Sequence, residues 1–106
     1  MRLTITNQKI RFRVSADELM ALSGGDRVDA ALHLGGREFS GCILPYDGEG
    51  EMRAELAADG IALHVSQAAL QALHDLGRSK DGITAHQDQV TVSLQLDLKT
   101  AMRLAG

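Results

Sequence analysis

The chain of 106 residues is predicted to adopt an α+β fold with about eight short, mostly antiparallel strands and two short helices. Three observations predict this fold. Apolar and polar residues alternate in short runs, polar or glycine-rich turns separate these runs, and two serines stand where helices would begin. Such strands either close into a barrel-like sheet or stack as two layers. The length fits one domain, which we expect to span residues 1–106.

The first half of the chain predicts two hairpins with a helix between them. Its expected strands cover residues 2–6, 10–14, 28–34 and 39–43. Ser15 and Glu18 have the spacing of a capping box, in which each side chain binds the backbone N–H of the other residue. Gly24 ends the helix, and Gly35-Gly36 is typical of a two-residue hairpin turn. Pro45 is expected to end the last strand because it has no N–H to donate.

The second half predicts the same order of elements. Its expected strands cover residues 52–56, 61–65, 83–85 and 90–98. Asp59-Gly60 is a strong turn signal, since primed turns need residues that accept a positive φ. Ser66 caps a second helix, which Gly77 ends. The last eight residues, 99–106, favour a further short helix.

The two halves match at an offset of 51 residues. The segment Ile10–Ser15 aligns with Ile61–Ser66, and Leu19 aligns with Leu70. We interpret this as a pseudo-twofold ββαββ repeat with halves of about 1–44 and 51–97. Convergence is the alternative, because any junction from a strand through serine to a helix favours these residue types. A repeat would bury the apolar faces of the two halves against each other.

The alternation also predicts the core. Leu19 and Leu70 are expected to be buried at equivalent places on the two helices. The apolar strand positions expected inside are Leu3, Ile5, Ile10, Phe12, Val14, Leu56, Ile61, Leu63 and Val65.

Composition and charge limit the function classes. The formal net charge is −3, from 11 basic and 14 acidic residues, so the chain lacks the overall basic character of many nucleic-acid-binding domains. A local basic patch stays open as an alternative. Cys42 is the single cysteine, which excludes an internal disulfide and favours a reducing compartment. No secretion signal and no membrane-spanning stretch are recognisable, so we expect a cytoplasmic protein.

The candidate ligand-binding residues are Arg2, Arg11, Arg13, Arg53 and His64. The three arginines of the first hairpin fall on the face opposite the predicted core, and the other two occupy repeat-equivalent positions. If both hairpins line one concave surface, that surface suits an anion, because guanidinium groups bind oxyanions through two parallel hydrogen bonds. The alternative is a solvated sheet face with cross-strand pairing to acidic neighbours such as Glu55.

No pattern predicts a catalytic site, a metal site or a cofactor. The four histidines share no ligand spacing with one another or with Cys42, and no glycine-rich phosphate loop is present. The segment Glu49–Arg53 reads E-x-E-x-R on an expected strand and resembles the E-x-E-x-K strand of triphosphate tunnel enzymes. That resemblance alone would imply a phosphate-binding enzyme.

Two further resemblances concern longer stretches. The run I-R-F-R-V-S-x-x-E-L at Ile10–Leu19, with the later segment Leu56–Leu73, resembles a family of short bacterial proteins of unknown function over nearly the whole chain. Residues 8–39 are similar to the swapped-hairpin fold of AbrB-type regulators and antitoxins, through Val14–Leu19 followed by Gly25–Val28. The second resemblance implies a DNA-binding dimer, although the proline usual after that family's first strand is absent.

Taken with the lack of catalytic signals, these patterns predict a small non-enzymatic binding or protein-interaction module. Its expected partner is another protein or a second copy of the chain, without a membrane. An AbrB-like DNA-binding regulator is the alternative, and a tunnel-type enzyme is the third reading.

Overall fold

A computed structural model describes residues 1–77 and 82–97 of the chain. The helix predicted for residues 99–106 lies outside this part. The elements in chain order are β1 (Arg2–Thr6), β2 (Lys9–Val14), α1 (Ala16–Ser23), β3 (Val28–Leu34), β4 (Arg37–Tyr46), β5 (Arg53–Ala57), β6 (Gly60–Ser66), α2 (Gln67–Leu76), β7 (Ile83–Gln87) and β8 (Val90–Leu96). The predicted α+β class, with eight strands and two helices, is confirmed.

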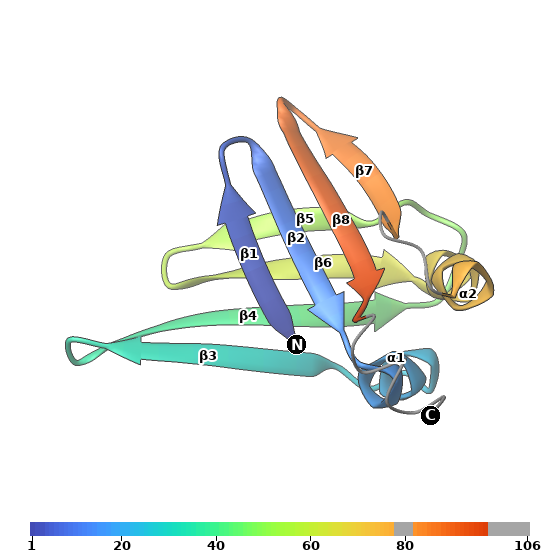
Figure 1. Cartoon of the computed structure of the whole chain (residues 1–106), viewed down its shortest axis with the longest axis horizontal. Helices are drawn as coiled ribbons and strands as arrows, with labels where there is room; N and C mark the ends of the chain where they lie inside the picture. The colour runs from blue at the N-terminus through green and yellow to red at the C-terminus, as the bar shows by residue number, and fades with distance from the viewer. Residues whose placement is uncertain (78–81, 98–106) are drawn as a thin grey trace.

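The strands form two open four-stranded sheets, so the barrel-like alternative is wrong and the two-layer alternative is right. One sheet has the order β1-β2-β8-β7 and the other has the order β3-β4-β6-β5. Four antiparallel hairpins supply all the strands. In the middle of each sheet two hairpins meet in a parallel pair, β2 with β8 and β4 with β6. The two sheets lie face to face with their strands crossing (Figure 1).

Each half of the chain contributes one hairpin to each sheet. The β1-β2 hairpin of the first half joins the β7-β8 hairpin of the second, and β3-β4 joins β5-β6. The registers correspond at the offset of 51: Phe12 pairs with Leu94 in one sheet, and Leu63 pairs with Ile43 in the other. The element order and the pairing are therefore those expected of a pseudo-twofold ββαββ arrangement that exchanges the two sheets.

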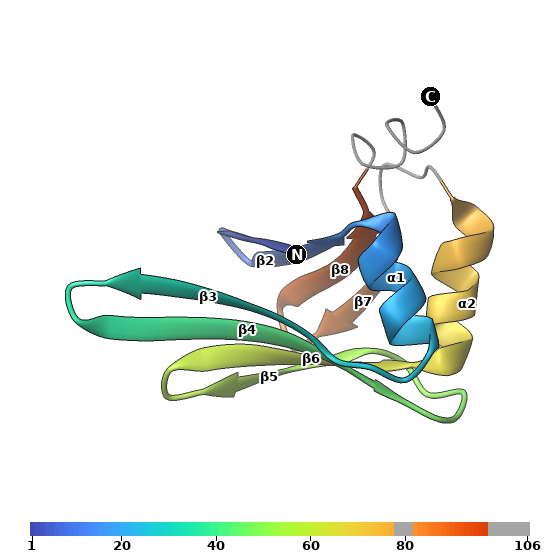
Figure 2. The same ribbon diagram turned by 90° about the horizontal axis from the view of Figure 1, so that it is seen from below.

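The core lies between the sheets and under the helices, which stand side by side at one end of the molecule (Figure 2). Leu70 and Leu73 of α2 are fully buried, and Leu19 and Leu22 of α1 are buried beside them. The other buried apolar side chains come mainly from the central strands: Phe12, Val14, Val28, Ile43, Met52, Ile61, Leu63, Val65, Val92 and Leu94.

Two of the predicted core residues are exposed. Ile5 is 58% exposed and Leu56 is 78% exposed, at equivalent positions near the tips of the β1-β2 and β5-β6 hairpins. Register with Ile10 and Ile61 places both side chains on the inner faces of their sheets. The sheets, however, diverge away from the helices, and the β3-β4 hairpin projects past the core (Figure 2). Alternation assigns a residue to a face, whereas burial depends on whether another layer reaches that part of the face.

Two predicted strand boundaries also differ. Pro45 lies inside β4, where it pairs with Val65 of the parallel neighbour. The turn of the β5-β6 hairpin consists of Ala58 and Asp59, so Gly60 is the first residue of β6. Gly60 does not need a positive φ. Instead, a Cβ at this position would collide with the backbone carbonyl oxygen of Ser40 on β4, which explains the need for glycine.

Serine caps begin both helices, as predicted. Ser15 Oγ accepts from the Glu18 N–H at 3.1 Å, and the Glu18 carboxylate accepts from the Ser15 N–H at 2.9 Å, which completes the capping box. Partial burial of Glu18 opposes its ionisation, but hydrogen bonds from the Met1 ammonium group and from Ser15 outweigh it and lower its pKa. Ser66 is fully buried and accepts from the Ala69 N–H at 3.0 Å while donating to the Gly50 carbonyl at 2.6 Å.

We expect the two caps to differ in strength. Ser66→Ala should lower the free energy of unfolding by about 1–3 kcal/mol, because it removes a fully buried cap and leaves the Gly50 carbonyl without the Ser66 hydroxyl as its donor. Ser15→Ala should cost only about 1 kcal/mol, because the cap it removes is partly exposed. Urea unfolding of both variants measures the difference, and equal midpoints would show that the Ser66–Gly50 hydrogen bond contributes nothing.

Candidate functional site: the basic face of one sheet

Three cations point away from the core along β2. Phe12 and Val14 are fully buried, so alternation places Lys9, Arg11 and Arg13 on the outer face of the β1-β2-β8-β7 sheet. Side chains on alternate residues of a strand are about 6.5–7 Å apart, so the three cations form a row across this face. Arg2 on β1 is the register partner of Arg13, which adds a fourth cation beside the row.

Uncharged polar residues surround this row of cations. The registers place Gln95 beside Arg13, Ser93 beside Arg11, and Thr91 beside Lys9, all on β8. Threonines on both outer strands complete the face. Together with the row, the residues of what we call the basic face are Arg2, Thr4, Thr6, Lys9, Arg11, Arg13, Thr84, His86, Thr91, Ser93 and Gln95.

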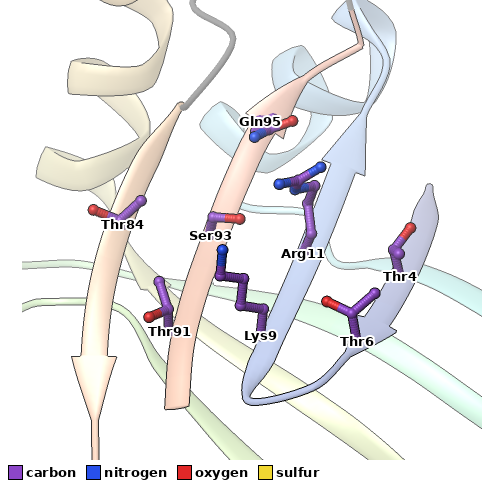
Figure 3. A pocket seen from close by; sticks show the side chains of 8 residues that line it. All are labelled: Thr4, Thr6, Lys9, Arg11, Thr84, Thr91, Ser93 and Gln95. Atoms are coloured by element: carbon purple, nitrogen blue, oxygen red, sulfur yellow. The ribbon is translucent and has the colours of Figure 1, made fainter. Parts of the chain in front are cut away.

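The face is concave rather than flat. A hollow of about 550 Å³ is lined by Thr4, Thr6, Lys9, Arg11, Thr84, Thr91, Ser93 and Gln95. Figure 3 shows the side chains of Lys9 and Arg11 rising from β2 between the hydroxyl-bearing strands. Ser93 and Gln95 are each only 7% exposed, so their polar groups lie at the bottom of the hollow.

The four cations of the basic face have no side-chain partner among the residues that the structure describes. None of Arg2, Lys9, Arg11 and Arg13 forms an ion pair or hydrogen bond with another side chain in the described part of the chain. Other arginines do have partners: Arg27 binds Asp29 at 2.6 Å. No residue of the basic face is an aspartate or a glutamate. The face therefore carries uncompensated positive charge on a chain whose net charge is −3.

The structure does not bring all five predicted site residues together. Arg53 and His64 are register partners on the outer face of the other sheet, β3-β4-β6-β5. There Glu55 lies 3.5 Å from Arg53 and 3.4 Å from His64. The prediction of one shared surface is wrong because the pseudo-twofold relation exchanges the sheets, so equivalent residues occupy opposite outer faces. Glu55 follows Arg53 by two residues on the same strand, so the cross-strand pairing offered as the alternative applies to His64 of β6 and not to Arg53.

The sequence pattern missed much of the basic face. Lys9 reads as part of a turn, yet it is the first residue of β2, after a turn of Asn7 and Gln8. Thr91, Ser93 and Gln95 read as the solvent side of an amphipathic strand. One signal for the site was present in the sequence: these three positions are polar but uncharged. The parallel pairing of β2 with β8 joins distant segments, and local periodicity carries no information about it.

Other kinds of site have less support. Within residues 1–77 and 82–97, no three His, Cys, Asp or Glu side chains gather closely enough to hold a metal ion. Glu49 and Glu51 of the E-x-E-x-R segment lie in the loop before β5, and only Arg53 is in the strand. Neither helix of the described chain has the length and apolar character needed to cross a membrane.

Comparisons with known proteins agree with the resemblance that covers nearly the whole chain. Neither a curated protein nor a solved structure matches the chain significantly, and nothing in the comparisons supports the AbrB-like resemblance of residues 8–39. A family model does match residues 1–103, and its description is a family of unknown function. By this match, the chain belongs to the Family of unknown function (DUF7009).

Proposed function

We propose that this chain is a non-enzymatic binding module that holds an acidic segment of a partner protein on its basic face. The observation that carries the proposal is a set of four cations on one sheet face that have no carboxylate partner within residues 1–77 and 82–97, two of which, Lys9 and Arg11, line the hollow. In an extended acidic segment, the carboxylates of alternate residues are about 6.5–7 Å apart, which is also the spacing of the cations along β2. Several charge-assisted hydrogen bonds can therefore form at once.

The residues around the cations support binding rather than catalysis. The hollow is lined by hydroxyl groups, one amide and two cations, and no lining residue is a carboxylate, histidine or cysteine that would act as general base or nucleophile. A tunnel-type enzyme needs charged residues inside a closed barrel. Here the side chains between the sheets are apolar and the sheets are open.

An AbrB-like DNA-binding regulator is the second candidate. The exchange of hairpins between the two halves is a swapped arrangement, and a row of cations also suits backbone phosphates. The two candidates differ in their salt dependence. Duplex DNA releases condensed counterions for each phosphate neutralised, so its affinity falls much more steeply with salt than that of a short acidic peptide.

Two finer statements accompany the proposal. We propose that the protein works in the cytoplasm, because its single cysteine is a free thiol, which favours a reducing compartment. We also propose that the halves 1–44 and 51–97 are copies of one unit. The support is the shared offset of 51 in sequence and in strand register.

The test compares two double variants with the same change in net charge. Arg11→Ser with Arg13→Ser removes two cations of the basic face, whereas Arg27→Ser with Arg53→Ser removes two arginines that have carboxylate partners. The probes are a polyglutamate peptide and a short DNA duplex, titrated against each protein at several salt concentrations. Thermal melts check that all variants remain folded.

We expect the Arg11/Arg13 variant to lose at least roughly tenfold in affinity for polyglutamate, since a hydrogen bond between charged groups contributes about 1.5–3 kcal/mol. The affinity of the Arg27/Arg53 control for polyglutamate should change by less than about twofold, because these two arginines already pair with carboxylates of their own chain. Equal losses in the two variants would mean that only net charge matters and would contradict the proposal. Tighter binding of DNA, with a steep salt dependence, would favour the second candidate instead.

A further inference from the structure

The four edge strands of the two sheets are not equally protected. On one side of the molecule, β5 and β7 lie next to each other, and the Gln87 side chain joins them. Its amide accepts from the Ala54 N–H at 2.9 Å and donates to the Ala54 carbonyl at 2.7 Å. A side-chain amide thus takes the place of a neighbouring strand at this edge.

On the opposite side, between β1 and β3, no such bridge is present among the described residues. The residue equivalent to Ala54 is Leu3 on β1, and by strand register the residue equivalent to Gln87 is Leu32 on β3, whose side chain has no hydrogen-bonding group. An apolar hollow lies there instead, lined by Leu3, Ile5, Ala30, Ala31, Leu32, Phe39 and Gly41. The β3 edge therefore lacks the protection that the β5 and β7 edges share.

β3 is also the longest of the four edge strands. It has seven residues, whereas β1, β5 and β7 have five each. It contains no proline and no lysine or arginine, which are residues that discourage pairing between sheet edges. It projects past the core on the β3-β4 hairpin (Figures 1 and 2).

The register of the hairpin shows which backbone groups of β3 point outward. Leu34 and Arg37 close a two-residue turn, so they form a hydrogen-bonded pair, and bonded and non-bonded pairs then alternate along the strand. Asp29, Ala31 and His33 accordingly direct their N–H and C=O groups away from β4. Within the described residues, no hydrogen bond uses these backbone groups.

We propose that β3 pairs with β3 of a second copy, antiparallel and centred on Ala31, to join two β3-β4-β6-β5 sheets into one continuous sheet. In this register Ala31 faces its own counterpart, and Asp29 faces His33 of the other copy. All three outward-directed residues then oppose outward-directed residues, which allows six backbone hydrogen bonds across the interface.

The side chains of β3 are complementary in the same register. On the outer face, the carboxylate of Asp29, which binds Arg27 of its own chain, lies opposite the imidazole of His33 of the other copy. On the inner face, the small Ala30 opposes the large Leu32, and Val28 opposes Leu34. Leu32 and Leu34 are 60% and 76% exposed in the single chain, so pairing removes apolar surface from water. A shift of the register by one residue would place outward-directed backbone groups of one β3 opposite inward-directed groups of the other. The backbone hydrogen bonds and the side-chain complementarity would both be lost.

The test depends on the self-opposed position of Ala31. Ala31 is exposed and its N–H is not used within the sheet, so charged replacements leave the single chain intact. Ala31→Glu places two carboxylates opposite each other, and Ala31→Lys places two ammonium groups opposite each other. A mixture of the two variants instead opposes a carboxylate and an ammonium group. Ala57→Glu and Ala57→Lys, at an exposed position on the other edge of the same sheet, are matched controls.

Sedimentation equilibrium should show a monomer–dimer equilibrium for the native chain, and each Ala31 variant alone should dimerise roughly tenfold more weakly through like-charge repulsion. The mixture of Ala31 variants should recover native affinity and yield mainly heterodimers by native mass spectrometry, whereas the Ala57 variants should behave as the native chain does. A native chain that stays monomeric at every concentration would overturn the proposal. Ala31 variants that associate normally would assign the contact to another surface and overturn it as well.

Discussion

Replacing Leu70 by alanine is expected to lower the free energy of unfolding by roughly 2–5 kcal/mol. Leu70 is fully buried in α2, where the two helices and the inner faces of both sheets meet. The substitution removes its transfer free energy and leaves a cavity that packed neighbours on several elements fill only in part. Leu19→Ala, at the equivalent place in α1, should have an effect of the same order because Leu19 is also buried.

The matched control is Leu56→Ala. The sequence pattern assigns Leu56 to the core as strongly as it assigns Leu63, but Leu56 is 78% exposed. We therefore expect the control to change stability by no more than about 0.5 kcal/mol. Denaturant unfolding followed by far-ultraviolet circular dichroism measures all three variants. A Leu70→Ala midpoint equal to that of Leu56→Ala would contradict the packing at the helix end.

Gly60→Ala is expected to destabilise the protein by about 2–3 kcal/mol, although alanine is normally the better residue in a strand. The new methyl group would lie inside the contact distance of the Ser40 carbonyl oxygen. That oxygen belongs to the backbone of β4, which is held on both sides by β3 and β6, so relief requires a shift of the parallel pair.

Gly41→Ala serves as the comparison, because it tests the same kind of change in the same sheet. There the nearest atom to the added methyl group is a side-chain carbon of Leu3 at 3.3 Å, which adjusts by rotation. We expect a change within about 1 kcal/mol of native for this variant. Thermal unfolding distinguishes the two, and a Gly60→Ala protein as stable as Gly41→Ala would show that the strands separate at no measurable cost.

The local elements of this fold were predictable from the sequence, and the reason is physical. Strand alternation, the capping box of Ser15 and Glu18, and the glycine turns all depend on neighbours within a few residues. All eight strands and both helices follow from such short-range signals. The errors at Pro45 and Gly60 arise where a parallel neighbour, rather than the local chain, determines what the residue does.

The arrangement of the elements and the candidate site were only partly predictable. Arg2, Arg11 and Arg13 were correctly placed on one outer face, because period-two alternation is sufficient for a single hairpin. Arg53 and His64 were assigned to the same surface because they align with Arg2 and Arg13 in the other half of the sequence. The alignment shows which residues are equivalent, but it does not show that equivalent hairpins lie in different sheets. Ser93, Gln95 and Thr91 join the basic face through the pairing of β2 with β8, which no local pattern encodes.

The exchange of hairpins between the halves gives the chain the topology of an intertwined dimer whose subunits have been joined by a loop. Neither half alone places both of its hairpins in one sheet, so each central parallel pair needs a strand from the other half. The loop between β4 and β5 converts this association into an intramolecular step with a high effective concentration. Because β2 and β8 lie near opposite ends of the chain, pairing them closes a long loop. The entropy of closing that loop is lost before the contacts of the pair can stabilise the protein. Such a high contact order favours slow, all-or-none folding over stepwise folding of the two halves.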